Sequence, residues 1–170
     1  MRALTLWLTG RPCAGKSTIA EHLLEELENR GIHVASLDGD ALRGRLSADL
    51  GFSAKDRVEN LRRAAHVARL FNENGIPVVA SFISPTDEVR RMIRGIVGEF
   101  MLGYVRCSLE EAERRDVKGM YKKARAGLIP EFTGVSAPFE EPLDAEIVVD
   151  SDKTGVDECV RQILRALGVA

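Results

Sequence analysis

Short apolar runs alternate along the chain with longer segments whose apolar residues recur every three or four positions. The short runs predict strands at residues 4–9, 32–37, 77–82, 101–107 and 146–150. The longer segments predict helices at residues 17–30, 58–74 and 156–167. Strands that alternate with helices are typical of an α/β fold, so we expect a mainly parallel five-stranded sheet with helices on both faces.

Two long segments, residues 43–57 and 119–143, show no clear periodicity. Irregular segments of that length in a compact domain are usually functional loops or lids. Ligands of parallel sheets bind beyond the carboxyl ends of the strands. We therefore expect the chemistry just after the strands that end at Thr9, Leu37, Phe82 and Cys107.

Length and charge narrow the class of protein. A chain of 170 residues fits one domain, which we place at residues 1–170, and its net charge of −2 argues against a nucleic-acid coat or a polybasic membrane binder. The three cysteines are widely spaced and predict reduced thiols rather than disulfides or a zinc site. No apolar run approaches the ~20 residues of a membrane span, and we interpret residues 4–9 as a strand rather than a signal peptide. We expect a cytoplasmic protein.

A phosphate-binding loop follows the first predicted strand. The pattern G-x-x-x-x-G-K-[ST], with a strand before it and a helix after it, is met by Gly10, Arg11, Pro12, Cys13, Ala14, Gly15, Lys16, Ser17 and Thr18. The glycines let backbone N–H groups point at phosphate oxygens, and the helix adds its positive end. Lys16 would reach the β- and γ-phosphates of ATP, and the Ser17 hydroxyl would bind Mg²⁺. These features predict a P-loop NTPase fold, against the alternative of a chance glycine turn.

Sequence features also indicate which kind of nucleotide protein this is. A GTPase would need an N-K-x-D tetrapeptide, and the chain has none. Motor and transporter ATPases carry an acid after four apolar residues in the strand where this chain has Ser81. Asp38 and Asp40 follow the second strand and can supply carboxylates for Mg²⁺ and for orienting a substrate hydroxyl. The alternative is an Asx turn that caps a following helix.

A second nucleotide site and a lid are suggested more weakly. Phe52 could stack on a base, and Arg57 and Asn60 lie on one face of a helix's first turn. Ser84 follows the third strand and should border the site. Six basic residues, with Asp116 as the one acid among them, predict a lid over residues 112–135: Arg114, Arg115, Lys118, Lys122, Lys123 and Arg125. A solvated helix face is the alternative for this cluster.

Together these strings resemble one family, the adenylylsulfate kinases. The resemblance spans essentially the whole chain, through L-D-G-D, D-L-G-F-S, D-R-x-E-N-x-R-R, S-F-I-S-P, R-D-V-K-G-x-Y-K-K-A-R-A-G and F-T-G. It implies transfer of the γ-phosphate of ATP, with Mg²⁺, to the ribose 3′-hydroxyl of adenylylsulfate (adenosine 5′-phosphosulfate), which produces activated sulfate. It also implies a homodimer. Fusion to or association with a sulfate adenylyltransferase stays open.

The resemblance assigns roles residue by residue. Positions that bind ATP in the family are matched by Lys16, Ser17 and Arg115, and Ser17 would also bind Mg²⁺. The resemblance implies that Asp40 contacts the acceptor hydroxyl and that Asp38 lies near the metal. The positions that hold adenylylsulfate are matched by Arg43, Phe52, Arg57, Asn60, Ile83, Ser84, Lys118 and Phe132. In the family Ser84 is described as a phosphoserine intermediate. Direct in-line transfer needs no covalent step, and we expect Ser84 to contact substrate instead.

Two alternatives stay open on the sequence. One is a related kinase whose acceptor is a nucleoside or a sugar acid, and the other is a nucleotide-binding regulator without catalysis. The aromatic residues Phe52 and Phe132 favour a nucleotide acceptor over a sugar acid. Lys16, Ser17, Asp38 and Asp40 favour a competent enzyme. Arg11, Pro12 and Cys13 stand where the family usually has small residues, and we expect the N–H cradle to be kept.

Overall fold

The computed structural model describes residues 2–116 and 118–169 of the chain. Met1, Val117 and Ala170, which our predictions include in the domain or in the lid, lie outside the described residues. Five parallel strands form one sheet in the order β2-β3-β1-β4-β5. They are β1 (Thr5–Thr9), β2 (Ala35–Asp38), β3 (Val78–Ser81), β4 (Phe100–Arg106) and β5 (Ile147–Asp150). The predicted fold class and all five strands are confirmed, with ends that differ from the prediction by at most three residues.

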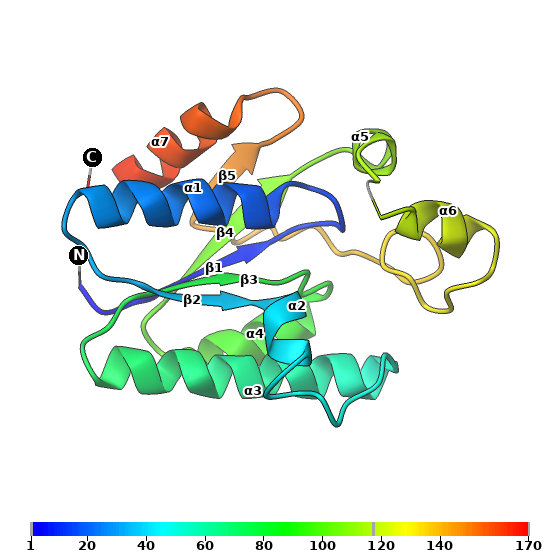
Figure 1. Ribbon diagram of the computed structural model, residues 1–170, viewed down its shortest axis with the longest axis horizontal. Helices are drawn as coiled ribbons and strands as arrows, with labels where there is room; N and C mark the ends of the chain where they lie inside the picture. The colour runs from blue at the N-terminus through cyan, green and yellow to red at the C-terminus, as the bar shows by residue number, and fades with distance from the viewer. Residues whose placement is uncertain (1, 117, 170) are drawn as a thin grey trace.

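Helices cover both faces of this sheet. Figure 1 shows α1 (Lys16–Asn29) and α7 (Val156–Ala166) on one face, and α3 (Ala54–Glu73) and α4 (Asp87–Val97) on the other. Each face has its own apolar cluster, one around Leu6 and Leu8 of β1 and one around Trp7. Successive residues of a strand point to opposite faces, which is why β1 serves both clusters. None of the helices in the described residues is long and apolar enough to cross a membrane.

Helix α4 was not predicted from the sequence, and α3 begins four residues before its predicted start. The hydroxyl of Ser53 accepts from the backbone N–H of Asp56 and so begins α3 at Ala54. Thr86 caps α4 in the same way, and Val89, Ile93 and Val97 form its buried stripe. Both helices begin at side-chain caps that a search for apolar periodicity does not detect.

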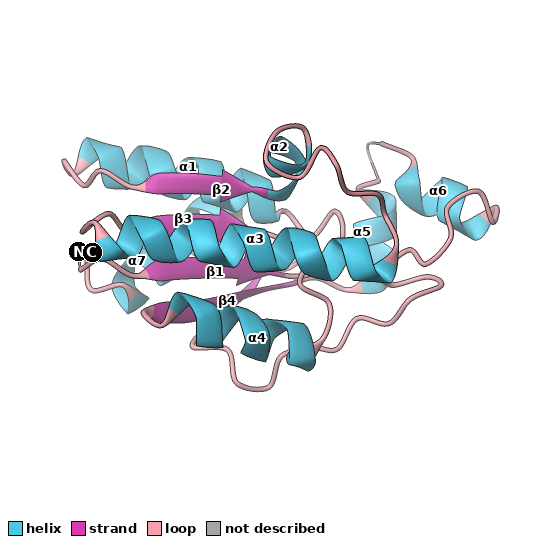
Figure 2. Cartoon of the chain, turned by 90° about the horizontal axis from the view of Figure 1, so that it is seen from below, coloured by secondary structure: helices cyan, strands magenta, loops and turns pink. Residues whose placement is uncertain are grey.

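Three short helices lie at the carboxyl edge of the sheet. They are α2 (Gly39–Arg43), α5 (Leu109–Arg114) and α6 (Met120–Arg125). Figure 2 shows α5 and α6 toward the end opposite the chain termini, and α2 beside the carboxyl end of β2. Asp38 caps α2 by accepting from the N–H groups of Asp40 and Ala41, so the Asx turn that the sequence left as an alternative is present. All three cysteines are free.

The exposed glycine inside α4 gives a test of this architecture. A Cβ at Gly95 would meet nothing within 4 Å. Alanine is a better helix former because it loses less backbone entropy, so Gly95→Ala should stabilise the protein by about 0.5–1 kcal/mol. A thermal unfolding scan should show Tm raised by about 2 °C.

The matched comparison is Gly10→Ala. A Cβ at Gly10 would stand 2.5 Å from the carbonyl oxygen of Val105, which is backbone and cannot swing away. This substitution should lower Tm where Gly95→Ala raises it. A lower Tm for Gly95→Ala would contradict the placement of α4.

Candidate functional site

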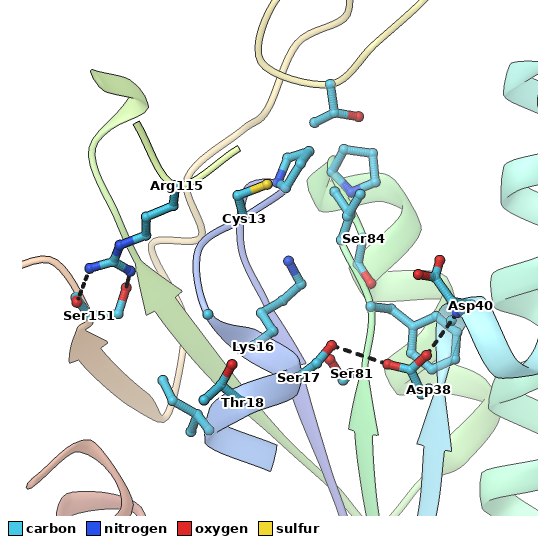
Figure 3. Close-up of a pocket in the computed structure, with 18 of the residues that line it drawn as sticks. Cys13, Lys16, Ser17, Thr18, Asp38, Asp40, Ser81, Ser84, Arg115 and Ser151 are labelled. Atoms are coloured by element: carbon cyan, nitrogen blue, oxygen red, sulfur yellow. Dashed lines mark hydrogen bonds between the residues drawn. The ribbon is translucent and has the colours of Figure 1, made fainter. Parts of the chain in front are cut away.

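A cavity of about 1000 Å³ opens at the carboxyl ends of β1, β2 and β3 (Figure 3). Its lining comes from the loop between β1 and α1, from α2, from the start of α3, from the turn after β3 and from residues 151–156. These segments are far apart in the sequence and meet because parallel strands end at one edge. The cavity is therefore where the sequence analysis expected the chemistry.

The loop before α1 forms a phosphate cradle. Gly10 packs against the Val105 carbonyl with no room for a Cβ, and Gly15, the residue that precedes α1, has a φ of 91°. Lys16 is only 8 % exposed, and its Nζ donates to the carbonyl oxygens of Gly10 (3.0 Å) and Arg11 (2.8 Å). Burial lowers the pKa of Lys16 to about 8. A bound polyphosphate would stabilise the charged ammonium.

Ser17 and Asp38 bring two oxygen donors together beside the cradle. The Ser17 hydroxyl donates to Asp38 Oδ2 at 3.2 Å, while Oδ1 of the same carboxylate caps α2 (Figure 3). A hydroxyl and a carboxylate are ligands that Mg²⁺ accepts, and the ion commonly takes further ligands from phosphates and water. The pair fits a magnesium ion that accompanies a nucleotide.

An ion pair spans the mouth of the cavity between Asp40 of α2 and Lys118. The Lys118 Nζ lies 2.9 Å from Asp40 Oδ2, and both side chains are exposed. The Asp40 carboxylate raises the pKa of Lys118 through this hydrogen bond. Both residues line the cavity that the phosphate cradle also lines.

Most of the predicted acceptor residues line the same cavity. They are Asp40, Arg43, Arg57, Asn60, Ile83, Ser84, Lys118 and Phe132. Phe52 does not line it: its side chain is 76 % exposed, and the Arg43 guanidinium lies 4.8 Å from the centre of its ring. The Arg57 guanidinium donates to the Glu131 carbonyl at 2.7 Å and joins α3 to the segment before Phe132.

Ser84 is held in an unusual backbone conformation. Its φ of 45° lies in the left-handed region, which costs a residue other than glycine about 1–3 kcal/mol. The residue is 1 % exposed, and its Oγ accepts from Trp7 Nε1 at 2.8 Å. Burial and this partner suit a positioning contact better than an attacking nucleophile.

The side chain of Arg11 turns away from the cavity. Its guanidinium pairs with Glu141 at 3.2 Å and lies 5.0 Å from the centre of the Phe139 ring. Gly10 and Ala14 are likewise absent from the lining, whereas the side chains or backbone of Pro12, Cys13, Gly15, Lys16, Ser17 and Thr18 are present. Burial and Asp116 raise the pKa of the Cys13 thiol.

The basic cluster divides between the cavity and the protein surface. Arg115 and Lys118 line the cavity. Arg114 and Arg115 pair with Glu111 and lower the pKa of that carboxyl to about 2, and Arg125 pairs with Glu113. Lys122 and Lys123 are exposed. The alternative of a solvated helix face therefore describes the other four basic residues.

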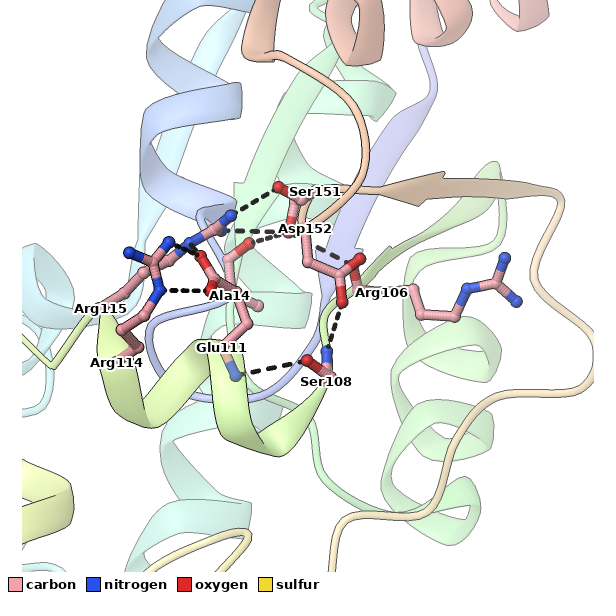
Figure 4. A network of polar contacts seen from close by, with 8 residues as sticks. All are labelled: Ala14, Arg106, Ser108, Glu111, Arg114, Arg115, Ser151 and Asp152. Atoms are coloured by element: carbon pink, nitrogen blue, oxygen red, sulfur yellow. Dashed lines mark hydrogen bonds and ion pairs between the residues drawn. The ribbon is translucent and has the colours of Figure 1, made fainter.

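A network of polar contacts ties the cradle to the end of β5 (Figure 4). The Arg115 guanidinium donates to the carbonyl oxygen of Ser151 at 2.7 Å, and the Ser151 hydroxyl donates to the Ala14 carbonyl at 2.7 Å. Tyr121 supports the cradle from the other side, since its hydroxyl donates to the Pro12 carbonyl at 3.0 Å. Neither residue was predicted from the sequence: Ser151 lies in none of the quoted strings, and Tyr121 stands in R-D-V-K-G-x-Y-K-K-A-R-A-G but was given no role there.

The depressed pKa of Lys16 predicts that nucleotide binding takes up a proton. In the free protein the pKa is about 8, and bound phosphates would raise it. Binding of ADP with Mg²⁺ should take up about half a proton at pH 8 and about a tenth at pH 7. Calorimetry in buffers of different ionisation enthalpy measures this number. Equal uptake at both pH values would contradict the buried lysine.

Comparison with known proteins agrees with this geometry. The family profile described as adenylylsulphate kinase matches residues 2–150. A probable adenylyl-sulfate kinase of Halalkalibacterium halodurans is 50 % identical over 165 residues, which are 96 % of this chain and 82 % of the relative. An adenylyl-sulfate kinase of Geotalea uraniireducens is 48 % identical over 166 residues, 96 % of this chain and 80 % of the relative.

Solved structures agree as well. The Mycobacterium tuberculosis APS kinase, determined in complex with AMPPNP and APS, superposes with a TM-score of 0.94, at 40 % identity, over 98 % of each chain. The match of the family profile to residues 2–150, together with relatives near 50 % identical over almost the whole chain, shows that the chain belongs to the adenylylsulphate kinase family.

Proposed function

We propose that this protein transfers the γ-phosphate of ATP to the ribose 3′-hydroxyl of adenylylsulfate. The observation that carries the proposal is a single cavity that is lined both by the phosphate cradle and by Arg43, Arg57, Asn60 and Phe132. Donor and acceptor can therefore meet in one chamber. In-line transfer requires such positioning and little covalent chemistry from the protein.

At the donor end the protein binds and orients a triphosphate. The N–H groups of the loop and the positive end of α1 face the phosphates. Lys16, already buried, exchanges its two carbonyl partners for phosphate oxygens and neutralises charge that develops on the transferred group. Ser17 and Asp38 would hold Mg²⁺, which supplies neutralisation of phosphate charge when it is bound. Arg115 would contact the nucleotide beside Ser151.

At the acceptor end Asp40 is the group that would orient the hydroxyl and take its proton. It stands at the start of α2 with its carboxylate exposed in front of the cradle. Its partner Lys118 would move from Asp40 to the substrate when the acceptor arrives. Arg43 and Arg57 carry charge suited to a phosphosulfate, and Phe132 offers a face to a base. Phe52 would join them through movement of its loop.

Ser84 acts in this proposal as a substrate contact and not as a covalent carrier. Its Oγ is buried and accepts a hydrogen bond from Trp7 Nε1. We take residues 1–170 as one kinase domain and residues 112–135, with α6, as its lid. Homodimerisation and a cytoplasmic location stay predictions, as does any fusion to or association with a sulfate adenylyltransferase.

Substrate dependence of ADP release tests the proposal. A coupled assay should show ADP release that depends on adenylylsulfate, with little release on adenosine or a sugar acid, because neither of these fills both the basic and the aromatic parts of the acceptor end. Strong release with a sugar acid would favour the related kinase. ATP binding without release on any acceptor would favour a regulator.

Asp40→Ala tests the role of the carboxylate. A general base typically contributes about 10²–10⁴-fold, so kcat should fall by that factor while the Kd of ATP changes by less than about threefold. Asp49→Asn is the matched control, since Asp49 is an exposed carboxylate that pairs with Arg63 outside the cavity. Turnover of Asp40→Ala equal to that of the control would refute the assignment.

A further inference from the structure

The turn after β3 is held from behind by residues that do not line the cavity. Ile83, Ser84 and Pro85 face the cavity at the acceptor end. Behind them lie Trp7 of β1 and Arg90 of α4, which are 0 % and 4 % exposed and absent from the lining. These two residues come from elements on either side of the turn, and both hydrogen-bond to Ser84.

Three donors converge on Ser84 and its neighbour. Trp7 Nε1 donates to Ser84 Oγ at 2.8 Å, and Arg90 Nη1 donates to the Ser84 carbonyl oxygen at 2.9 Å. The Thr9 hydroxyl donates to the Ile83 carbonyl at 2.5 Å and approaches that of Ser84 at 3.3 Å. A residue other than glycine keeps a left-handed φ only where its surroundings enforce it. These donors are such surroundings.

The buried side chain of Arg90 supplies hydrogen bonds as well as packing. Its guanidinium also pairs with Asp87, one turn earlier in α4, while its Nε is buried without a partner among the described residues. An apolar side chain of similar volume often serves stability as well as a buried charge does. What an apolar side chain cannot supply is a donor to the Ser84 carbonyl.

We infer that Trp7 and Arg90 are positioning residues for the acceptor nucleotide. By holding Ser84 in its left-handed conformation they fix the shape of the turn that adenylylsulfate meets. The phosphate cradle follows β1 and makes no hydrogen bond to Arg90 among the described residues. Loss of either donor therefore weakens acceptor binding and spares donor binding. The inference rests on the proposed function.

Arg90→Met is the first test. It keeps most of the side-chain volume and removes the donors. The KM for adenylylsulfate should rise about tenfold, because small displacements of a positioning group are costly, while the KM for ATP stays within about twofold. Arg90→Lys, which keeps one charged donor, should recover part of the loss. Arg94→Met is the matched control: Arg94 lies one turn further along α4, pairs with Glu146 at 2.7 Å and does not contact the turn.

Trp7→Phe is the second test and serves if Arg90→Met does not fold. Phenylalanine keeps a ring to stack on Phe82, whose centroid lies 4.7 Å from that of Trp7, and lacks the N–H donor. The KM for adenylylsulfate should rise about threefold, as expected for loss of one hydrogen bond. In a Ser84→Ala background the same substitution should change the Kd of adenylylsulfate no further, because its partner atom is gone.

Outcomes separate this inference from the proposed function. If the wild-type protein shows no ADP release that depends on adenylylsulfate, the proposed function fails. If it is active, equal changes of both KM values in Arg90→Met, or none, overturn the inference alone. Additive effects of Trp7→Phe and Ser84→Ala on the Kd overturn it as well.

Discussion

A buried ammonium group is the constraint around which this site is built. Lys16 lies at the start of α1 with its charge taken out of water and held by two carbonyl oxygens of its own loop. Burial disfavours the charge, and a polyphosphate would restore it. A single turn sets the positions of the cradle, of the start of α1 and of Lys16. Gly10 permits this turn because it has no side chain to collide with the Val105 carbonyl.

The proposed acceptor site has a different construction. The cradle is a continuous stretch of chain, whereas the residues proposed to hold the acceptor come from α2, from α3, from the turn after β3 and from residues around Phe132. Such a site depends on supports outside it. Arg57 anchors the segment that carries Phe132, and Trp7 and Arg90 anchor Ser84. Rigid supports behind a binding surface limit the entropy that is lost when a substrate is ordered.

The sequence predicted what local patterns encode. The parallel sheet, the cradle and the two acids after β2 follow from short apolar runs and from one motif. Helix α4 was not predicted because it is defined by a side-chain cap and by a short stripe of buried apolar residues. Ser151 and Tyr121 were not predicted because each donates to a backbone carbonyl more than a hundred residues away in the chain. Arg90 was not predicted because its partner is the backbone carbonyl of Ser84, which no sequence pattern marks as an acceptor. Most of the basic cluster lies on the surface, since Glu111 and Glu113 from α5 pair with arginines that the sequence suggested would face phosphates.

The central claim is that donor and acceptor meet directly in one cavity, with Ser84 as a buried contact. The stereochemical course at the transferred phosphorus tests it most directly. With ATP made chiral at the γ-position, a single in-line transfer inverts the configuration, and our account predicts inversion in the phosphorylated adenylylsulfate. Retention would mean two successive transfers through a covalent intermediate on the protein, and would contradict the account.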